Sequence, residues 1–144
     1  MAKKAPASTA PTTPAKGKAL EVGERAKPAT PPSAPARHLD VFPNPAPQRD
    51  YVIQFQAPEF TCFCPLTGQP DFAQFTIDCI ADELCIELKS LKMYMWSYRN
   101  DGAFHEKVTN SILDDMVKAI QPRYLRITAK WYVYTTLNGN TIVD

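Results

Sequence analysis

The sequence is poor in glycine, and its glycines form no known nucleotide-binding motif. Five glycines stand among 144 residues, at positions 17, 23, 68, 102 and 139. They give neither the G-x-G-x-x-G pattern of a dinucleotide-binding turn nor a phosphate-binding P-loop. A nucleotide cofactor would therefore have to bind through other residues.

Long apolar runs are also missing. No stretch of the sequence approaches the roughly 20 apolar residues that cross a bilayer. Lys3 and Lys4 are followed by no apolar segment, so we expect no secretory signal, and the prolines after them disfavour the helix of an organellar leader. Four cysteines without such a signal are expected to be reduced thiols. We predict a cytoplasmic protein that does not enter a membrane.

Aromatic residues are nearly absent from the first third of the chain. Residues 1–50 hold 10 of the 14 prolines but only one of the 15 aromatic residues, Phe42. Such a segment buries too little apolar surface to offset the entropy of ordering it. The sequence predicts a disordered Pro/Ala/Lys-rich tail over residues 1–48, which serves at most as a weak tether, and one folded domain over residues 49–144.

The two parts of the chain carry opposite net charge. Residues 1–50 contain eight Lys and Arg against four Asp and Glu, a net charge of +4, which leaves 8 − 11 = −3 for residues 51–144. A mildly acidic domain lacks the excess of Lys and Arg that binds a phosphate backbone, so direct tRNA binding is not expected. Because a domain this small has a high surface-to-volume ratio, it often gains stability by forming a homo-oligomer.

Hydrophobic periodicity predicts the elements of the folded part. Alternating patterns predict strands at residues 51–55, 72–80, 84–87 and 124–133. Helices are predicted at 90–98, with Ser90 as N-cap, and at 105–120, ended by Pro122. Residues 58–71, rich in proline, are predicted to be a loop. This order predicts an α+β domain in which two helices pack on one face of an antiparallel sheet.

The cysteine spacing does not suit a structural zinc site. Only one residue separates Cys62 from Cys64, and Cys79 and Cys85 fall in different predicted elements, unlike the C-x₂₋₄-C pairs of such sites. We therefore expect no metal, and we expect Cys79 and Cys85 to pack as small apolar residues. Cys64 lies in the predicted loop before Asp71, where a thiol and a carboxylate together can supply a nucleophile and a proton donor. A loop cysteine without a role fits the same pattern.

Three segments resemble the NADPH-dependent 7-cyano-7-deazaguanine reductases, the nitrile reductases of queuosine biosynthesis. They read CPLTGQPDF at 64–72, ELKSLKMY at 87–94 and YRNDGAFHE at 98–106. The resemblance spans about residues 51–133 in order and fits the short, single-domain form of the family. It implies a tunnelling fold, a ring-forming homo-oligomer built as a pentameric ring or stacked rings, and active sites at the subunit boundaries.

The resemblance also implies a role for individual residues. Cys64 would add to the nitrile carbon of 7-cyano-7-deazaguanine to form a covalent thioimide, and Asp71 would donate the proton. Reduction to 7-aminomethyl-7-deazaguanine takes four electrons and hence two NADPH. The substrate would be held by Ile86, Glu87, Leu88, His105 and Glu106, and the NADPH phosphates by Lys89 and Lys92.

Two functions other than the reductase stay open. A zinc-dependent cyclohydrolase-like enzyme of the same fold would need Cys and His ligands around a bound metal, and a non-catalytic relative would only bind a purine or pterin.

Two residues depart from the family pattern, in which Leu and Phe are more often expected at positions 93 and 98. Tyr98 adds a hydroxyl that needs a hydrogen-bond partner if it is buried, and Met93 has a volume similar to that of leucine. Cys62 either packs in the core or forms a regulatory disulfide with Cys64.

Overall fold

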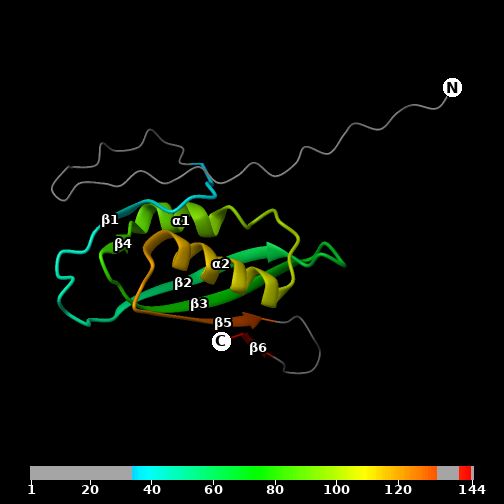
Figure 1. The fold of residues 1–144 in the computed structure, drawn as a ribbon. Coiled ribbons are helices and arrows are strands. Elements are labelled where there is room, and N and C mark those ends of the chain that lie inside the picture. Colours follow the sequence, from blue (N-terminus) through cyan, green and yellow to red (C-terminus); the bar gives the residue numbers. More distant parts are fainter. Residues whose placement is uncertain (1–33, 133–139, 144) are drawn as a thin grey trace.

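The described chain is an α+β domain with both helices on one side of an antiparallel sheet (Figure 1). The computed structural model describes residues 34–132 and 140–143, so residues 1–33 of the tail predicted over residues 1–48 lie outside the described residues. The elements are β1 (Val41–Pro43), β2 (Ile53–Phe63), β3 (Pro70–Ile80), β4 (Leu84–Ile86), α1 (Leu88–Trp96), α2 (His105–Ile120), β5 (Tyr124–Tyr132) and β6 (Asn140–Val143). The main sheet has the order β2-β3-β5-β6, and β1 pairs with β4 in a second, two-stranded sheet. The predicted arrangement is confirmed, although the sequence analysis predicts no strand at β1 or β6.

The core lies between the inner face of the main sheet and α2. Alternate residues of β3 and β5 point inward, as their period of two predicts, while α2 contributes one apolar stripe. Its largest fully buried side chains come from these elements: Trp131, Phe75, Ile77, Ile112, Met116 and Val108, with Tyr94 from α1. Cys79 and Cys85 are buried beside them, as expected of small apolar residues.

The predicted loop at 58–71 is wrong, because most of it belongs to two long strands. β2 continues to Phe63 and β3 begins at Pro70, which leaves only residues 64–69 as the turn between them. The pairing register shifts between Ala57 and Phe60, at a bulge that accommodates Pro58 on the outer strand of the sheet. Beyond the bulge, Phe60 and Cys62 alternate inward and are fully or almost fully buried.

The first helix begins two residues earlier than predicted, and its N-cap is Glu87 rather than Ser90. The two carboxylate oxygens of Glu87 accept hydrogen bonds from the backbone N–H groups of Lys89, at 2.9 Å, and Ser90, at 2.7 Å. Ser90 is buried inside the first turn, where its hydroxyl donates to the carbonyl of Glu87 at 2.8 Å. A carboxylate also complements the positive end of the helix dipole, which explains this choice of cap.

The packed region extends N-terminally of the predicted boundary at residue 49. Phe42 of β1 pairs with Cys85 of β4, and Leu39 is buried in the core. Asn44 is buried as well, and its side chain bonds Tyr51 and the carbonyl of Asp82. The composition of the first 50 residues does not reveal this, because residues 39–44 pack mainly against partners more than 35 residues further along the chain.

Tyr98, one of the two departures from the family pattern, fits the packing around α1. The Tyr98 hydroxyl lies 2.8 Å from that of Tyr94, so the predicted need for a partner is met. The guanidinium of Arg37 lies 3.5 Å from the centroid of the Tyr98 ring, a cation–π contact. Tyr94 in turn donates to Asp115 of α2 at 2.6 Å, which ties the two helices together.

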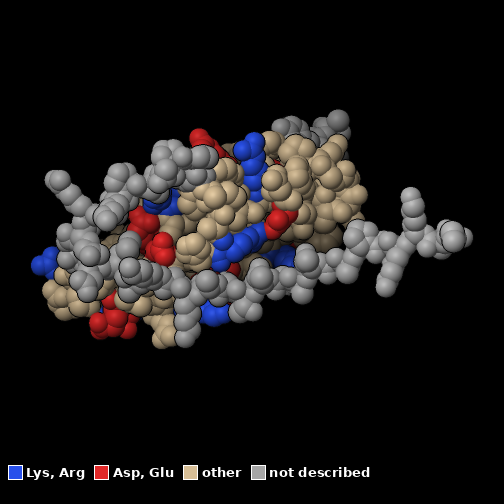
Figure 2. Space-filling model, turned by 90° about the horizontal axis from the view of Figure 1, so that it is seen from above, with Lys and Arg blue, Asp and Glu red and all other residues tan. Residues whose placement is uncertain are grey.

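The face seen from the helix side carries mixed charge. Lys and Arg side chains lie interspersed with Asp and Glu there, and neither sign forms one continuous patch over the visible described residues (Figure 2). Among the described residues, no helix has the length and apolar character needed to pass through a membrane.

Replacing Gln121 with glycine should stabilise the protein by roughly 0.5–1 kcal/mol. Gln121 is the C-cap of α2 and has a φ of 44°, in the left-handed region where a Cβ is unfavourable. Its backbone N–H, which glycine and alanine also supply, donates to the carbonyl of Val117 at 2.8 Å. Urea unfolding measures the change, with Gln121→Ala as the control that keeps the Cβ and should show no gain. A Gln121→Gly variant no more stable than Gln121→Ala would contradict the prediction.

Candidate active site

A tight turn at the end of β2 positions the candidate nucleophile. The backbone N–H of Cys64 donates to the carbonyl of Gln69 at 2.8 Å, and the N–H of Gly68 donates to the carbonyl of Cys64 at 2.9 Å. Gly68 has a φ of +69°, a conformation that glycine adopts without strain. The turn therefore closes the β2–β3 hairpin and holds Cys64 at its start.

The sulfur of Cys64 is the best placed of the four thiols to react. Hydrogen bonds from the Thr67 hydroxyl and from the backbone N–H groups of Thr67 and Leu66 lower the pKa of Cys64, against smaller opposing effects of burial and of the charge on Asp71. Burial acts the other way on Cys62 and raises its pKa to about 12. All four cysteines are free thiols, and Cys62 is fully buried, so it packs in the core beside the reactive position.

A carboxylate and an imidazole lie beside the turn. Oδ2 of Asp71, the second residue of β3, is 3.2 Å from Nε2 of His105, the first residue of α2. Their side chains are only 20% and 22% exposed. The His105 ring lies flat on the indole of Trp131, with 3.9 Å between ring centroids and 4° between planes. The stacking on Trp131, a core residue, thus fixes the position of the His105 ring next to Asp71.

The segment that leads into α2 is attached to the residue before Cys64. Phe63 donates its N–H to the carbonyl of Asp101 at 2.9 Å and accepts from the N–H of Ala103 at 3.1 Å. Between these two bonds lies Gly102, where an added Cβ would stand only 3.4 Å from Cα of Pro65. This close approach brings the start of α2 against the Cys64 turn.

These contacts border an open cavity of about 350 Å³ between the turn and the start of α2. Four of the predicted site residues line it: Cys64, Asp71, His105 and Glu106. Its volume falls in the range of small-molecule sites. Thr67 and Gln69 also line it, although the sequence analysis did not single them out. The position of Thr67, three residues after Cys64 in a short turn, could have indicated from the sequence that it lies near the cysteine.

The other predicted substrate residues lie elsewhere in the subunit. Ile86 is buried in the core, and the carboxylate of Glu87 caps α1. Leu88 is 66% exposed and faces a different cavity. Within one subunit, the structure does not bring these three residues to Cys64.

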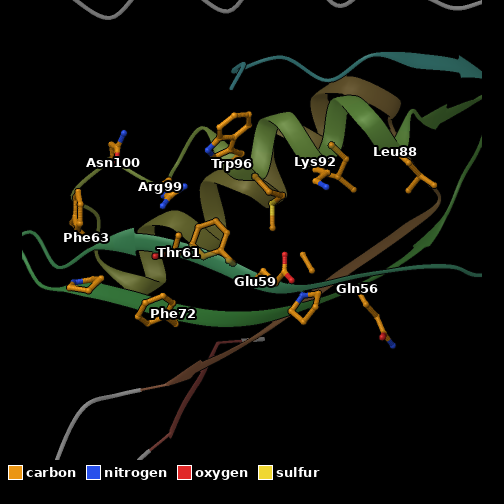
Figure 3. A pocket seen from close by; sticks show the side chains of 16 residues that line it. Gln56, Glu59, Thr61, Phe63, Phe72, Leu88, Lys92, Trp96, Arg99 and Asn100 are labelled. Carbon is orange, nitrogen blue, oxygen red and sulfur yellow. The ribbon is translucent and has the colours of Figure 1, made fainter. Parts of the chain in front are cut away.

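A larger groove of about 730 Å³ runs between α1 and the β2–β3 hairpin (Figure 3). Lys92 and Arg99 line it and supply two positive charges, whereas Lys89 does not line it. Trp96 and Phe72 form part of its exposed apolar wall. Pro70 lines both this groove and the Cys64 cavity, so the two are adjacent. Arg99 was missed by the sequence analysis because the groove exists only once α1 packs over the hairpin.

The described residues contain no group of three or more His, Cys, Asp or Glu side chains arranged to hold a metal ion. The Cys64 cavity itself presents thiol, carboxyl and imidazole groups.

Fold and cavity together define a class of protein: an α+β domain with an activated cysteine beside a carboxylate–imidazole pair, suited to covalent attack on an electrophilic carbon. Comparison with known proteins narrows this class. The family model described as QueF-like protein matches residues 70–143. The NADPH-dependent 7-cyano-7-deazaguanine reductase of Nitrosospira multiformis is 61% identical over 102 residues, covering 71% of this chain and 73% of the relative. The enzyme of the same name from Alkalilimnicola ehrlichii is 58% identical over 107 residues, covering 72% and 83%. The chain belongs to the family of these reductases.

A solved structure supports the fold. The apo form of the archaeosine synthase QueF-Like superposes with a TM-score of 0.58 at 20% sequence identity, covering 64% of this chain and 88% of the other. The two proteins share a fold.

Proposed function

We propose that this protein is an NADPH-dependent nitrile reductase that converts 7-cyano-7-deazaguanine to 7-aminomethyl-7-deazaguanine in queuosine biosynthesis. The observation that carries the proposal is the meeting of Cys64, with its lowered thiol pKa, and Asp71 in one cavity. Membership of a family whose relatives bear this activity in their names supports the same substrate.

In the proposed mechanism, the thiolate of Cys64 adds to the nitrile carbon. A C–S bond forms, one π bond between carbon and nitrogen breaks, and the nitrogen takes a proton from Asp71 to give a thioimide. NADPH, when bound, supplies two hydrides in succession. The full reduction of the nitrile consumes two hydrides and two protons, and cleavage of the C–S bond restores the thiolate. Nε2 of His105 lies 3.2 Å from the carboxyl group of Asp71 and orients it. After Asp71 has given its proton to the substrate nitrogen, His105 can supply a new proton to the carboxylate before the second hydride is transferred.

Glu106 is suited to hold the base in the cavity. A carboxylate has two oxygens, which together accept hydrogen bonds from a ring N–H and an exocyclic amine of a guanine-like base. Glu106 is exposed and lines the same cavity as Cys64. Because the base is uncharged, the acidic residues of the pocket do not repel it.

The groove of Figure 3 fits the cofactor. Lys92 and Arg99 match the charge of its phosphates, and the apolar wall with Trp96 and Phe72 matches its rings. Lys89, at the start of α1, would then contact the phosphates from outside the groove. Because Pro70 lines both cavities, a cofactor in the groove has a short way to the residues around Cys64.

We further propose that a complete site forms between two subunits of a tunnelling-fold ring. Glu87 and Leu88 do not line the Cys64 cavity of their own subunit, so a substrate that meets both must lie between two copies. β2 and β6 are the outer strands of the described main sheet, which leaves them suited to pairing across subunits.

The proposed function is tested by titrating purified protein with 7-cyano-7-deazaguanine and following NADPH oxidation to completion. We expect two NADPH oxidised per nitrile, because a nitrile accepts four electrons on its way to an amine. A benzonitrile control should give no oxidation, since it lacks the amine and ring N–H groups that Glu106 binds. Absence of NADPH oxidation with 7-cyano-7-deazaguanine would overturn the proposal, and a metal found in that inactive protein would favour the cyclohydrolase-like alternative.

A further inference from the structure

Arg37, in the segment before β1, contacts the turn that joins α1 to α2 in three ways. Its guanidinium forms an ion pair with the carboxylate of Asp101 and lies 3.5 Å from the centroid of the Tyr98 ring. It also donates a long hydrogen bond, of 3.5 Å, to the carbonyl of Ser97. Because a guanidinium is planar, one side chain can stack on a ring and bond a carboxylate at its edge. A single residue thus contacts the turn at both of its ends.

The backbone of Arg37 is itself held along α1. The residue before it donates its N–H to the carbonyl of Met93 at 3.2 Å. On the other side, Leu39 is buried in the core, and the N–H of Asp40 donates to the hydroxyl of Ser90 at 2.9 Å. This segment passes beside α1 in Figure 1. The guanidinium therefore extends from a fixed point and can anchor the turn, although the composition of this part of the chain predicts disorder.

Asp101 connects this anchor to the strand that carries the candidate nucleophile. Its carbonyl accepts a hydrogen bond from the N–H of Phe63 at 2.9 Å, and the N–H of Ala103 donates to the carbonyl of Phe63 at 3.1 Å. Phe63 is the last residue of β2, and Ala103 stands two residues before α2. We call this pair of backbone bonds the joint between the hairpin and α2. The side chain of Asp101 is bonded to Arg37, while its backbone is part of the joint.

We propose that Arg37 is a positioning residue for the candidate active site: by fixing Asp101 it keeps the joint closed and holds the start of α2 against the Cys64 turn. This inference rests on the proposed function, in which Cys64, Asp71 and His105 act together. The hairpin supplies the thiol and the carboxyl group, whereas α2 supplies the imidazole, so their mutual geometry depends on the joint. A displacement of reacting groups by about 1 Å is enough to lower a rate strongly.

The anchor lies at the surface, so its loss should not unfold the protein. The side chains of Arg37 and Asp101 are 40% and 51% exposed, and exposed ion pairs and cation–π contacts contribute little to global stability. The hydroxyl of Tyr98 keeps its partner Tyr94, 2.8 Å away, without Arg37. Arg37→Ala can therefore loosen the joint while the core stays intact.

The test measures backbone hydrogen exchange and reductase activity of the full-length protein. Exchange at the amides of Phe63 and Ala103, followed by mass spectrometry of peptides, reports opening of the joint, and the amides between β3 and β5 report opening of the core. Arg49→Ala is the matched control for Arg37→Ala. Arg49 is exposed in the same part of the chain, and its side chain forms no hydrogen bond or ion pair with another described residue.

We expect Arg37→Ala to speed exchange at the joint about fivefold, through loss of one cation–π contact and one ion pair, and to leave exchange in the core unchanged. The kcat for nitrile reduction should fall at least about threefold, and Arg49→Ala should match the wild type. Arg37→Lys keeps the charge without the planar stack and should give intermediate values.

Asp101→Asn tests whether Arg37 acts through Asp101. This variant removes the charge of the carboxylate and should speed exchange at the joint about twofold. The double variant Arg37→Ala/Asp101→Asn should match Arg37→Ala, because the ion pair is lost only once. Effects that instead multiply to about tenfold would show two independent contributions and would overturn the inference.

Three further results would overturn the inference: equal exchange at the joint in Arg37→Ala and Arg49→Ala, faster exchange throughout the core of Arg37→Ala, or an unchanged kcat. Hydrogen exchange needs neither the nitrile nor NADPH. A protein that shows the expected exchange but oxidises no NADPH even as the wild type would therefore refute the proposed function and leave the anchoring of the joint by Arg37 standing.

Discussion

Cys64→Ala should lower nitrile-dependent NADPH oxidation by at least ~10⁴-fold, because the variant lacks the nucleophile and the remaining groups cannot form the covalent intermediate. The wild-type protein incubated with 7-cyano-7-deazaguanine without NADPH should gain the mass of one substrate molecule per chain, and the variant should gain none. Steady-state absorbance measures the rate, and mass spectrometry of the denatured protein measures the adduct.

Cys62→Ala is the matched control for this experiment. Cys62 lies two positions away but is fully buried and has its pKa raised to about 12 by burial, so it is neither accessible nor ionised at neutral pH. The variant should keep most of the activity and form the adduct. Activity that survives in Cys64→Ala, or an adduct on Cys62, would show that the nucleophile has been assigned to the wrong thiol.

Trp131→Ala should lower the free energy of unfolding by about 3–5 kcal/mol, the range for removing a large buried aromatic side chain. Trp131 is fully buried and makes edge contacts with Phe60, at 5.7 Å, and Phe75, at 5.9 Å, besides the stack with His105. For a domain with a total stability on the order of 5–15 kcal/mol, this is a large fraction. Urea unfolding at fixed protein concentration measures the loss.

Trp131→Phe is the informative partner of this variant. The indole Nε1 has no hydrogen-bond partner among the described residues, so phenylalanine gives up no hydrogen bond there and retains a ring under His105. We expect a smaller loss of stability and more reductase activity than in Trp131→Ala. Equal stabilities of Trp131→Ala and the wild type would contradict the central place of this residue in the core.

The elements that bury one face each were predicted best. The strict alternation in β5 and the apolar stripe of α2 agree with the observed burial, because a period of two or of 3.6 residues reports which face is inside. Pro58 misled the prediction of β2, since proline usually interrupts strands and only the pairing with β3 reveals the bulge. The N-cap was wrong because Glu87 competes with Ser90 through the helix dipole, an effect that local preference for serine does not include.

The part of the candidate site that lies within one hairpin was predictable from the sequence. Cys64 and Asp71 are close because one hairpin joins them, and the spacing of the motif already indicates this. The approach of His105 depends on the backbone bonds between Phe63 and the segment before α2, which no periodicity encodes. Arg99 and the groove it lines arise from packing between α1 and the hairpin, so they were invisible in the sequence.

The pairing of β1 with β4 has a consequence for the order in which the chain folds. β2 and β3 are neighbours in sequence, so their hairpin closes a short loop and can form as soon as both strands have left the ribosome. β1 is made before both, yet its partner β4 and the Ser90 hydroxyl that accepts from the Asp40 N–H come much later. Although β1 is synthesised first among the described elements, it therefore cannot dock until β4 and the start of α1 have been made, by which time the β2–β3 hairpin can already have formed.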